Sequence, residues 1–111
     1  MKYGLQDNAI QGIHGVLSRF PQVTRATLYG SRAKGNQRKG SDIDLALCGD
    51  ADLTLKVLCK IAEDLEALSL PYTFDLALRS AISDSDLLEH INRAGVVFYE
   101  KGSDSCRKLV E

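Results

Sequence analysis

The sequence predicts a single domain of the α/β (α+β) class, a small mixed β-sheet with helices packed on one face and the other face open. Two observations carry this prediction. Residues 42–48 and 72–79 alternate apolar and polar side chains, which is typical of strands with one buried face. Between them, residues 53–68 carry apolar side chains at helical spacing, which predicts a helix with one long apolar stripe.

The first elements along the chain are a helix, a strand and a turn. The apolar side chains of residues 5–19 recur at near-helical spacing, which predicts an amphipathic helix. Residues 23–29 are rich in β-forming side chains and predict the first strand. The chain then turns at Gly30, where we expect a short helix to begin. Residues 35–41 are polar and flanked by glycine, which predicts a loop.

The segment that follows this loop places apolar and acidic side chains on opposite faces of a strand. Because side chains alternate along a strand, Ile43 and Leu45 share the apolar face, whereas Asp42 and Asp44 share the other. The second alternating segment repeats this arrangement and carries Asp75 on its polar face. If the two strands are neighbours, all three carboxylates lie on one exposed side of the sheet.

The remaining elements are predicted from caps and apolar runs. Asp52 is expected to cap the long helix between the two alternating strands. Ser83 is expected to cap a helix over residues 84–94, which Gly95 would end. Residues 96–99 form a short apolar run, which predicts an edge strand.

One short stretch joins a phosphate-binding pattern to a metal-binding pattern, because Gly30-Ser31 is followed after ten residues by Asp42-Ile43-Asp44. A glycine-serine pair that opens a helix can offer backbone N–H groups to a phosphate. Magnesium is held in proteins by a few carboxylates together with substrate phosphates. The stretch therefore predicts a site for a metal-bound nucleoside triphosphate. It matches neither a P-loop nor a dinucleotide-binding fingerprint.

Basic side chains follow the glycine-serine pair within eight residues: Arg32, Lys34, Arg38 and Lys39. Most basic loops are simply solvated, but beside this motif we expect Arg32 and Lys34 to neutralise the charge of a polyphosphate. The whole chain has a net charge of −1 and a pI of about 6.1. This balance does not indicate direct binding of nucleic acid.

The motif resembles that of the DNA polymerase β-like nucleotidyltransferase superfamily. The residues that carry the resemblance are Gly30, Ser31, Asp42, Asp44 and Asp75. The short chain is most similar to the minimal nucleotidyltransferases (MNT), a group that often serves as the antitoxin beside a HEPN-domain protein. The resemblance covers roughly residues 5–99 and implies the nucleotidyltransferase fold, with the acidic face of the sheet as the active site.

The resemblance also implies a role for each motif residue. Gly30 and Ser31 would hold the β- and γ-phosphates of ATP. Asp42, Asp44 and Asp75 would bind two Mg²⁺ ions, and Asp75 would also help to deprotonate the attacking hydroxyl. The implied reaction is the transfer of AMP from ATP to a tyrosine of a HEPN toxin, with which the chain would form a hetero-oligomer.

Two other functions stay open on the sequence. The chain could be a non-catalytic binding module that neutralises its partner by occlusion. Transfer to a small molecule would require an acceptor pocket, and a chain of this length has little room for a second domain to build one. We therefore expect another protein to supply the acceptor surface, in contact with the open sheet edge, residues 96–99 and the C-terminal tail.

Length and cysteine content set the remaining expectations. A chain of 111 residues is the size of one domain, and we assign residues 1–100 to it and residues 101–111 to a polar C-terminal tail. Cys48, Cys59 and Cys106 have no metal-binding spacing and form no disulfide framework, and the first two are expected to be buried. No apolar run approaches a membrane span and no signal-peptide pattern is present, so we expect a cytoplasmic protein.

Overall fold

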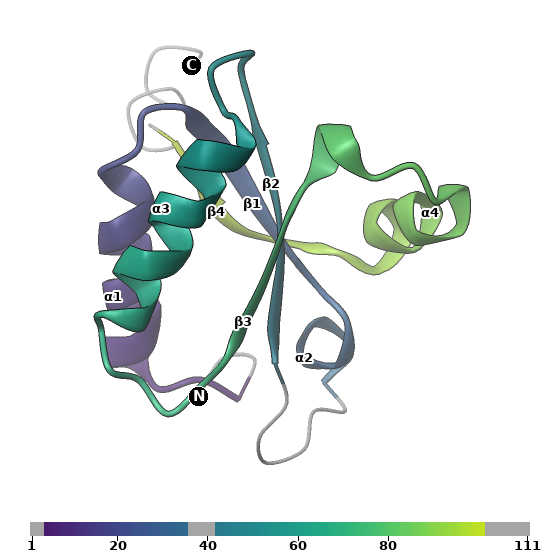
Figure 1. Ribbon diagram of the computed structural model, residues 1–111. Helices are drawn as coiled ribbons and strands as arrows, with labels where there is room; N and C mark the ends of the chain where they lie inside the picture. The colour runs from purple at the N-terminus through teal and green to yellow at the C-terminus, as the bar shows by residue number, and fades with distance from the viewer. Residues whose placement is uncertain (1–3, 36–41, 102–111) are drawn as a thin grey trace, which may run out of the picture.

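The computed structural model describes residues 4–35 and 42–101, which form a four-stranded sheet flanked by helices (Figure 1). The strands are β1 (Val23–Tyr29), β2 (Ile43–Gly49), β3 (Phe74–Leu78) and β4 (Val96–Glu100). The helices are α1 (Asp7–Ser18), α2 (Ser31–Lys34), α3 (Leu55–Glu66) and α4 (Ser85–Ala94), with a short 3₁₀ turn, η1 (Arg79–Ala81), after β3. The predicted fold class and the order of its elements are confirmed.

The strands lie in the order β3-β2-β1-β4, and the sheet is mixed. β1 pairs antiparallel with both β2 and β4, whereas β2 and β3 run parallel and are joined by α3. A parallel pair needs such a crossover, because both strands must begin at the same edge. The predicted neighbourhood of the two alternating strands is therefore confirmed, and β4 is an edge strand as expected.

One face of the sheet is covered by α1 and α3, which lie on the same side of it (Figure 1). The core between these layers is built from the inward side chains of both helices and of β1 and β2. Its largest fully buried members are Leu5, Ile13, Leu17, Leu28, Ile43, Leu45, Leu47, Ile61 and Leu65. The apolar face predicted for residues 42–48 is thus the core face of β2.

The opposite face of the sheet is covered in part by α4, so the expectation that all helices pack on one face and leave the other open is wrong for this helix (Figure 1). Ile91 of α4 is buried, and Gly95, which ends this helix as predicted, lies against β1. A Cβ atom on Gly95 would come within 2.7 Å of Thr27 Cγ2. The face stays accessible at the end where Asp75 is exposed and Asp44 is half-buried.

Both predicted helix caps are wrong by one or two residues. α3 begins after Thr54, whose hydroxyl accepts a hydrogen bond from the backbone N–H of Val57, and not after Asp52. Similarly, the carboxylate of Asp84, and not Ser83, caps α4. Each segment holds several side chains that can cap a helix, and only the backbone conformation decides between them.

His14 joins α1 to β4. Its Nε2 atom lies 2.7 Å from the carbonyl oxygen of Phe98, and its ring meets the rings of Phe98 and Tyr99 edge-on. A register irregularity in the β1–β4 pairing, between Ala26 and Thr27, brings both aromatic side chains to the α1 side of the sheet. The contacts of His14 therefore hold the edge strand against the core.

The expectation for the cysteines is wrong in part. Cys59 is exposed on α3, because the buried stripe of this helix runs through Leu58, Ile61 and Leu65. Cys48 is half-buried, and Cys106, like the remainder of the predicted tail after Lys101, lies outside the described residues. Within residues 4–35 and 42–101, none of the helices has the length and apolar character needed to cross a membrane.

The core arrangement makes a prediction about stability. Ile61→Ala removes a fully buried side chain between α3 and the sheet and is expected to lower the free energy of unfolding by ~2–5 kcal/mol. Leu55→Ala, on the same helix but 65% exposed, should change it by less than ~0.5 kcal/mol. Urea unfolding followed by circular dichroism checks both values, and equal losses in the two variants would contradict this assignment of the core.

Candidate functional site

Two carboxylates from neighbouring strands meet on the accessible face of the sheet. Asp44 of β2 and Asp75 of β3 are direct partners in the parallel register. Their side chains therefore point to the same side of the sheet, and they are hydrogen-bonded to each other. A hydrogen bond between two carboxyl groups requires a proton on one of them. The structure thus brings together two of the three predicted acidic residues as a closely coupled pair.

The proton affinity of Asp44 is perturbed. Burial raises the pKa of Asp44 from its ordinary value of 3.8 to about 6, and the negative charges of Asp75 and Asp42 act in the same direction. A hydrogen bond that protonated Asp44 donates to Asp75 adds to this effect, whereas the positive charge of Arg32 opposes it. A bound cation between the carboxylates would remove the repulsion that raises this pKa. The pair therefore offers the negative charge and the oxygen donors that a divalent cation requires.

Gly30 lies directly against this carboxylate pair. It ends β1 with a φ of +80°, a conformation that L-residues with a Cβ atom rarely adopt. A Cβ atom at this position would collide with Asp44 Oδ2 and would lie 3.3 Å from Asp44 Cγ. The turn and the acidic strand therefore meet, as the sequence motif predicts, and the contact requires glycine.

Arg32 places a positive charge beside the pair. Its side chain is 3% exposed, so it does not extend into a solvated loop. The guanidinium carbon of Arg32 lies 5.1 Å from the ring centroid of Tyr72, over the face of the ring. The positive charge of Arg32 partly offsets the causes that raise the pKa of Asp44. The side chains of the other two predicted nucleotide-binding residues, Ser31 and Lys34, lie outside the part of the chain that the structure describes.

Asp42 is not a member of the coupled pair, although its negative charge raises the pKa of Asp44. It is exposed, it lies just before β2, and its Oδ1 accepts a hydrogen bond from the hydroxyl of Thr73. Among residues 4–35 and 42–101, no three His, Cys, Asp or Glu side chains gather closely enough to form a metal-binding group. Two carboxylates still fit Mg²⁺, because this ion usually takes one or two from the protein and the rest of its ligands from phosphates and water.

Sequence reasoning missed Tyr29, which also lies at the site. Tyr29 is the cross-strand partner of Asp44, and its side chain is half-buried on the same face of the sheet. Burial raises the pKa of its phenol, and the negative charges of Asp75 and Asp44 raise it further. The alternation of β1 could have indicated this position of Tyr29. Leu28 faces the core, and the next side chain along a strand points to the opposite face, which here carries the acidic residues.

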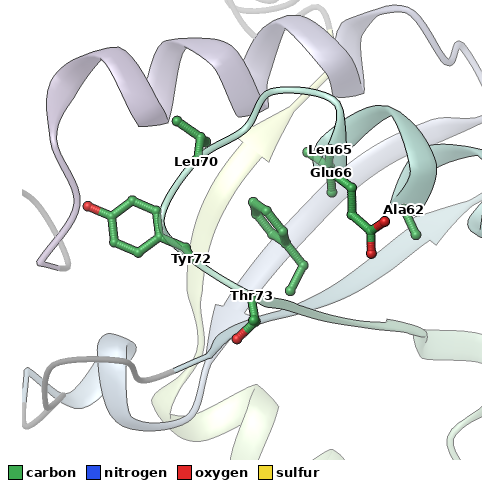
Figure 2. Close-up of a pocket in the computed structure, with 7 residues that line it drawn as sticks. Ala62, Leu65, Glu66, Leu70, Tyr72 and Thr73 are labelled. Carbon is green, nitrogen blue, oxygen red and sulfur yellow. The ribbon is translucent and has the colours of Figure 1, made fainter.

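A pocket of about 340 Å³ lies beside the site, between the end of α3 and the segment that leads into β3 (Figure 2). Figure 2 shows Ala62 and Glu66 on the helix, and Leu70, Tyr72 and Thr73 on the segment before the strand. Tyr72 and Thr73 are the residues that contact Arg32 and Asp42. This wall of the pocket is therefore shared with the acidic site.

The raised pKa of Asp44 predicts a pH dependence of stability in the absence of metal ions. Because the folded protein binds this proton more tightly than the unfolded chain, folding takes up a proton between pH 3.8 and about 6. The stabilisation is complete below pH 3.8 and is lost as the pH rises through about 6. Asp44→Asn should therefore melt a few degrees higher than the wild type at pH 7 in EDTA, and not at pH 4.

Thermal melts of the two proteins at both pH values check this expectation. Saturating Mg²⁺ and ATP should reverse the order at pH 7, because only the wild type keeps the ionisable carboxylate. The same difference in melting temperature at pH 4 and pH 7 in EDTA would contradict the coupling of Asp44 to its acidic neighbours.

Comparison with known proteins gives matches to one family and to solved structures. The family model described as "Polymerase beta, Nucleotidyltransferase" matches residues 11–104. A protein of Haemophilus influenzae named "Probable protein adenylyltransferase MntA" is 36% identical over 73 residues, which are 66% of this chain. The chain spans 63% of the length of that relative.

Two solved structures share the fold. A chain of a toxin-antitoxin structure with AMP-PNP superposes with a TM-score of 0.67 at 24% identity, over 90% of this chain and 77% of that one. A chain from the complex of a tri-AMPylated Shewanella oneidensis HEPN toxin with an MNT antitoxin gives a TM-score of 0.63 at 20% identity, over 91% of this chain and 77% of that one. At these sequence identities the structural similarity shows a shared fold and nothing about activity.

Proposed function

Because this chain belongs to the polymerase beta nucleotidyltransferase family, we propose that it transfers AMP from ATP to a tyrosine hydroxyl of a HEPN-domain toxin and so acts as its antitoxin. The observation that carries the proposal is the register of Asp44 and Asp75, which places two coupled carboxylates against the Gly30 turn. Family membership supports a nucleotidyl transfer in general, and the donor and the acceptor are the parts that we add.

The relatives support this choice of donor and acceptor. The name of the Haemophilus influenzae relative describes an adenylyltransferase that acts on protein. Solved structures with the same fold contain AMP-PNP in one case and an AMPylated HEPN toxin in another.

The proposed reaction forms a bond between the acceptor oxygen and the α-phosphorus of ATP. The bond between the α-phosphorus and the oxygen that bridges it to the β-phosphorus breaks, and pyrophosphate leaves with that oxygen. Asp75 is exposed and takes the proton of the attacking hydroxyl. Gly30 and Ser31 hold the β- and γ-phosphates, and Arg32 and Lys34 balance the charge of the leaving pyrophosphate.

Mg²⁺ would be held by Asp44 and Asp75, with Asp42 as a further ligand, and when bound it supplies the positive charge that stabilises the attacking and leaving oxygens. Asp44 is best placed to orient this group, because Gly30 packs against its carboxylate and fixes its direction. Arg32 is held rigidly at the same site and needs no reordering to meet a negative charge.

Intact-mass analysis tests the proposal directly. The purified chain is incubated with its HEPN-domain partner, ATP and Mg²⁺, and the partner is expected to gain the mass of one or more AMP groups. Peptide mapping should then locate each group on a tyrosine. EDTA in place of Mg²⁺ should prevent the gain. An unchanged mass of the partner under all conditions, with complex formation intact, would favour neutralisation by occlusion.

A further inference from the structure

Tyr72 and Thr73, the two residues just before β3, contact the two other segments that build the site, namely α2 and the start of β2. Tyr72 lies beneath the guanidinium of Arg32, which belongs to α2. Thr73 donates its hydroxyl hydrogen bond to Asp42, which lies just before β2. Neither residue is part of the recognised motif, and their role follows only from these contacts.

The Tyr72 contact holds Arg32 in one place. A guanidinium over an aromatic face is attracted by the ring, and the attraction is larger where water is excluded. Arg32 is 3% exposed, so this contact is formed in a desolvated environment. The charge of Arg32 reaches Asp44, whose pKa it lowers. Tyr72 thus fixes the location of a positive charge beside the acidic pair.

The Thr73 contact orients Asp42. Besides the hydroxyl bond to Asp42, the carbonyl oxygen of Thr73 accepts a hydrogen bond of 2.9 Å from the backbone N–H of Ile43. Thr73 is therefore hydrogen-bonded through its side chain to Asp42 and through its backbone to Ile43, the first residue of β2. Asp42 is exposed, so without this hydroxyl its carboxylate would rotate freely in water.

We propose that Tyr72 and Thr73 are positioning residues, of which Thr73 orients Asp42 toward the metal and Tyr72 orients Arg32 toward the triphosphate. The proposal rests on the nucleotidyl transfer proposed above, because it assigns to Thr73 a part in binding the metal and to Tyr72 a part in holding Arg32 where it balances the charge of the leaving pyrophosphate. Groups that orient a metal ligand by hydrogen bonding usually change metal affinity about 10–100-fold when they are removed.

Thr73→Val and Thr73→Ser form a matched pair, because valine keeps the shape of threonine and serine keeps the hydroxyl. The melting temperature of each protein is measured against Mg²⁺ concentration at a fixed concentration of AMP-PNP. We expect Thr73→Val to need about 10-fold more Mg²⁺ for half of the stabilisation, and Thr73→Ser to match the wild type. Both variants should melt like the wild type in EDTA.

Tyr72→Leu and Tyr72→Phe form the second pair, because phenylalanine keeps the aromatic face and leucine keeps only apolar volume. In the transfer reaction with the HEPN-domain partner, Tyr72→Leu should lower kcat about 5-fold while the Mg²⁺ midpoint and the KM for ATP stay near those of the wild type. Tyr72→Phe should retain full kcat. Tyr72→Leu is thus expected to change kcat, whereas Thr73→Val is expected to change the Mg²⁺ concentration at the midpoint.

The outcomes separate this inference from the proposed function. Equal Mg²⁺ midpoints for Thr73→Val and Thr73→Ser, or equal kcat for Tyr72→Leu and Tyr72→Phe, would overturn the corresponding assignment. A wild-type protein that transfers nothing to its partner would overturn the proposed function. The Mg²⁺ titration with AMP-PNP would still decide the role of Thr73, because it requires no transfer.

Discussion

Asp44→Asn is expected to lower the rate of AMP transfer by ~10³-fold or more, the largest effect of any substitution in this chain. The substituted side chain would keep its shape and a hydrogen bond to Asp75, but the change removes the negative charge that is paired in register with Asp75. A neutral amide cannot replace a carboxylate as a ligand of a hard cation. The rate is measured as the gain in mass of the partner with time at saturating ATP and Mg²⁺.

The exposed Asp52 offers a matched control for this experiment. Asp52→Asn makes the same chemical change in the loop before α3, at a position with no part in the site, and should leave the rate unchanged. If Asp44→Asn still transferred AMP at the wild-type rate, the proposed catalytic site would be wrong. If it lost transfer but still neutralised the toxin, occlusion would account for the antitoxin effect.

Gly30→Ala is expected to reduce transfer by ~10²-fold or more, because a displacement of about 1 Å in a reacting group already costs this much. Alanine at a φ of +80° is strained by ~1–2 kcal/mol, and its methyl group would also collide with the carboxylate of Asp44. The collision forces Asp44 away from its present position. Activity should therefore fall by more than the loss of stability can explain.

Gly35→Ala separates the two causes. Gly35 has a φ of +81°, but a Cβ atom built on it meets none of the residues that the structure describes within 4 Å. This variant therefore carries the backbone strain of Gly30→Ala without the contact to Asp44. Thermal melts should show a loss of stability in both variants, whereas the binding of Mg²⁺ and AMP-PNP should be lost only in Gly30→Ala. Equal binding by the two variants would show that the contact between Gly30 and Asp44 is unimportant.

Local patterns in the chain were sufficient to predict most of the fold. Strand β1 was predicted with its observed bounds, and β2 and β3 were predicted to within two residues at each end, because alternation reports which side chains face the core. β2 and β3 are neighbours, which is the condition under which their acidic faces were expected to meet. The helix caps failed, because neighbouring residues with similar side chains compete for the same role.

The candidate site was predictable where its residues belong to one motif. Gly30 and Asp44 were expected to meet, and they are in contact. Tyr29 was missed although the alternation of β1 places it on the acidic face. The roles of Tyr72 and Thr73 were not found in advance, because each acts on the site through a partner that is distant in the sequence. Arg32 was identified as a basic residue near the phosphates, but its burial over an aromatic ring could not be read from its neighbours in the chain.

The amino-acid sequence by itself determined the secondary structure, the two faces of each central strand and the motif that brings glycine and aspartate together, because each of these depends on residues close to one another in the chain. Only the tertiary structure decided that Asp44 lies beside Asp75 with a raised pKa, that α4 covers part of the second face, and that Thr73 is hydrogen-bonded to Asp42. These features depend on strand register and on the packing of distant segments, which a one-residue shift in pairing would change entirely.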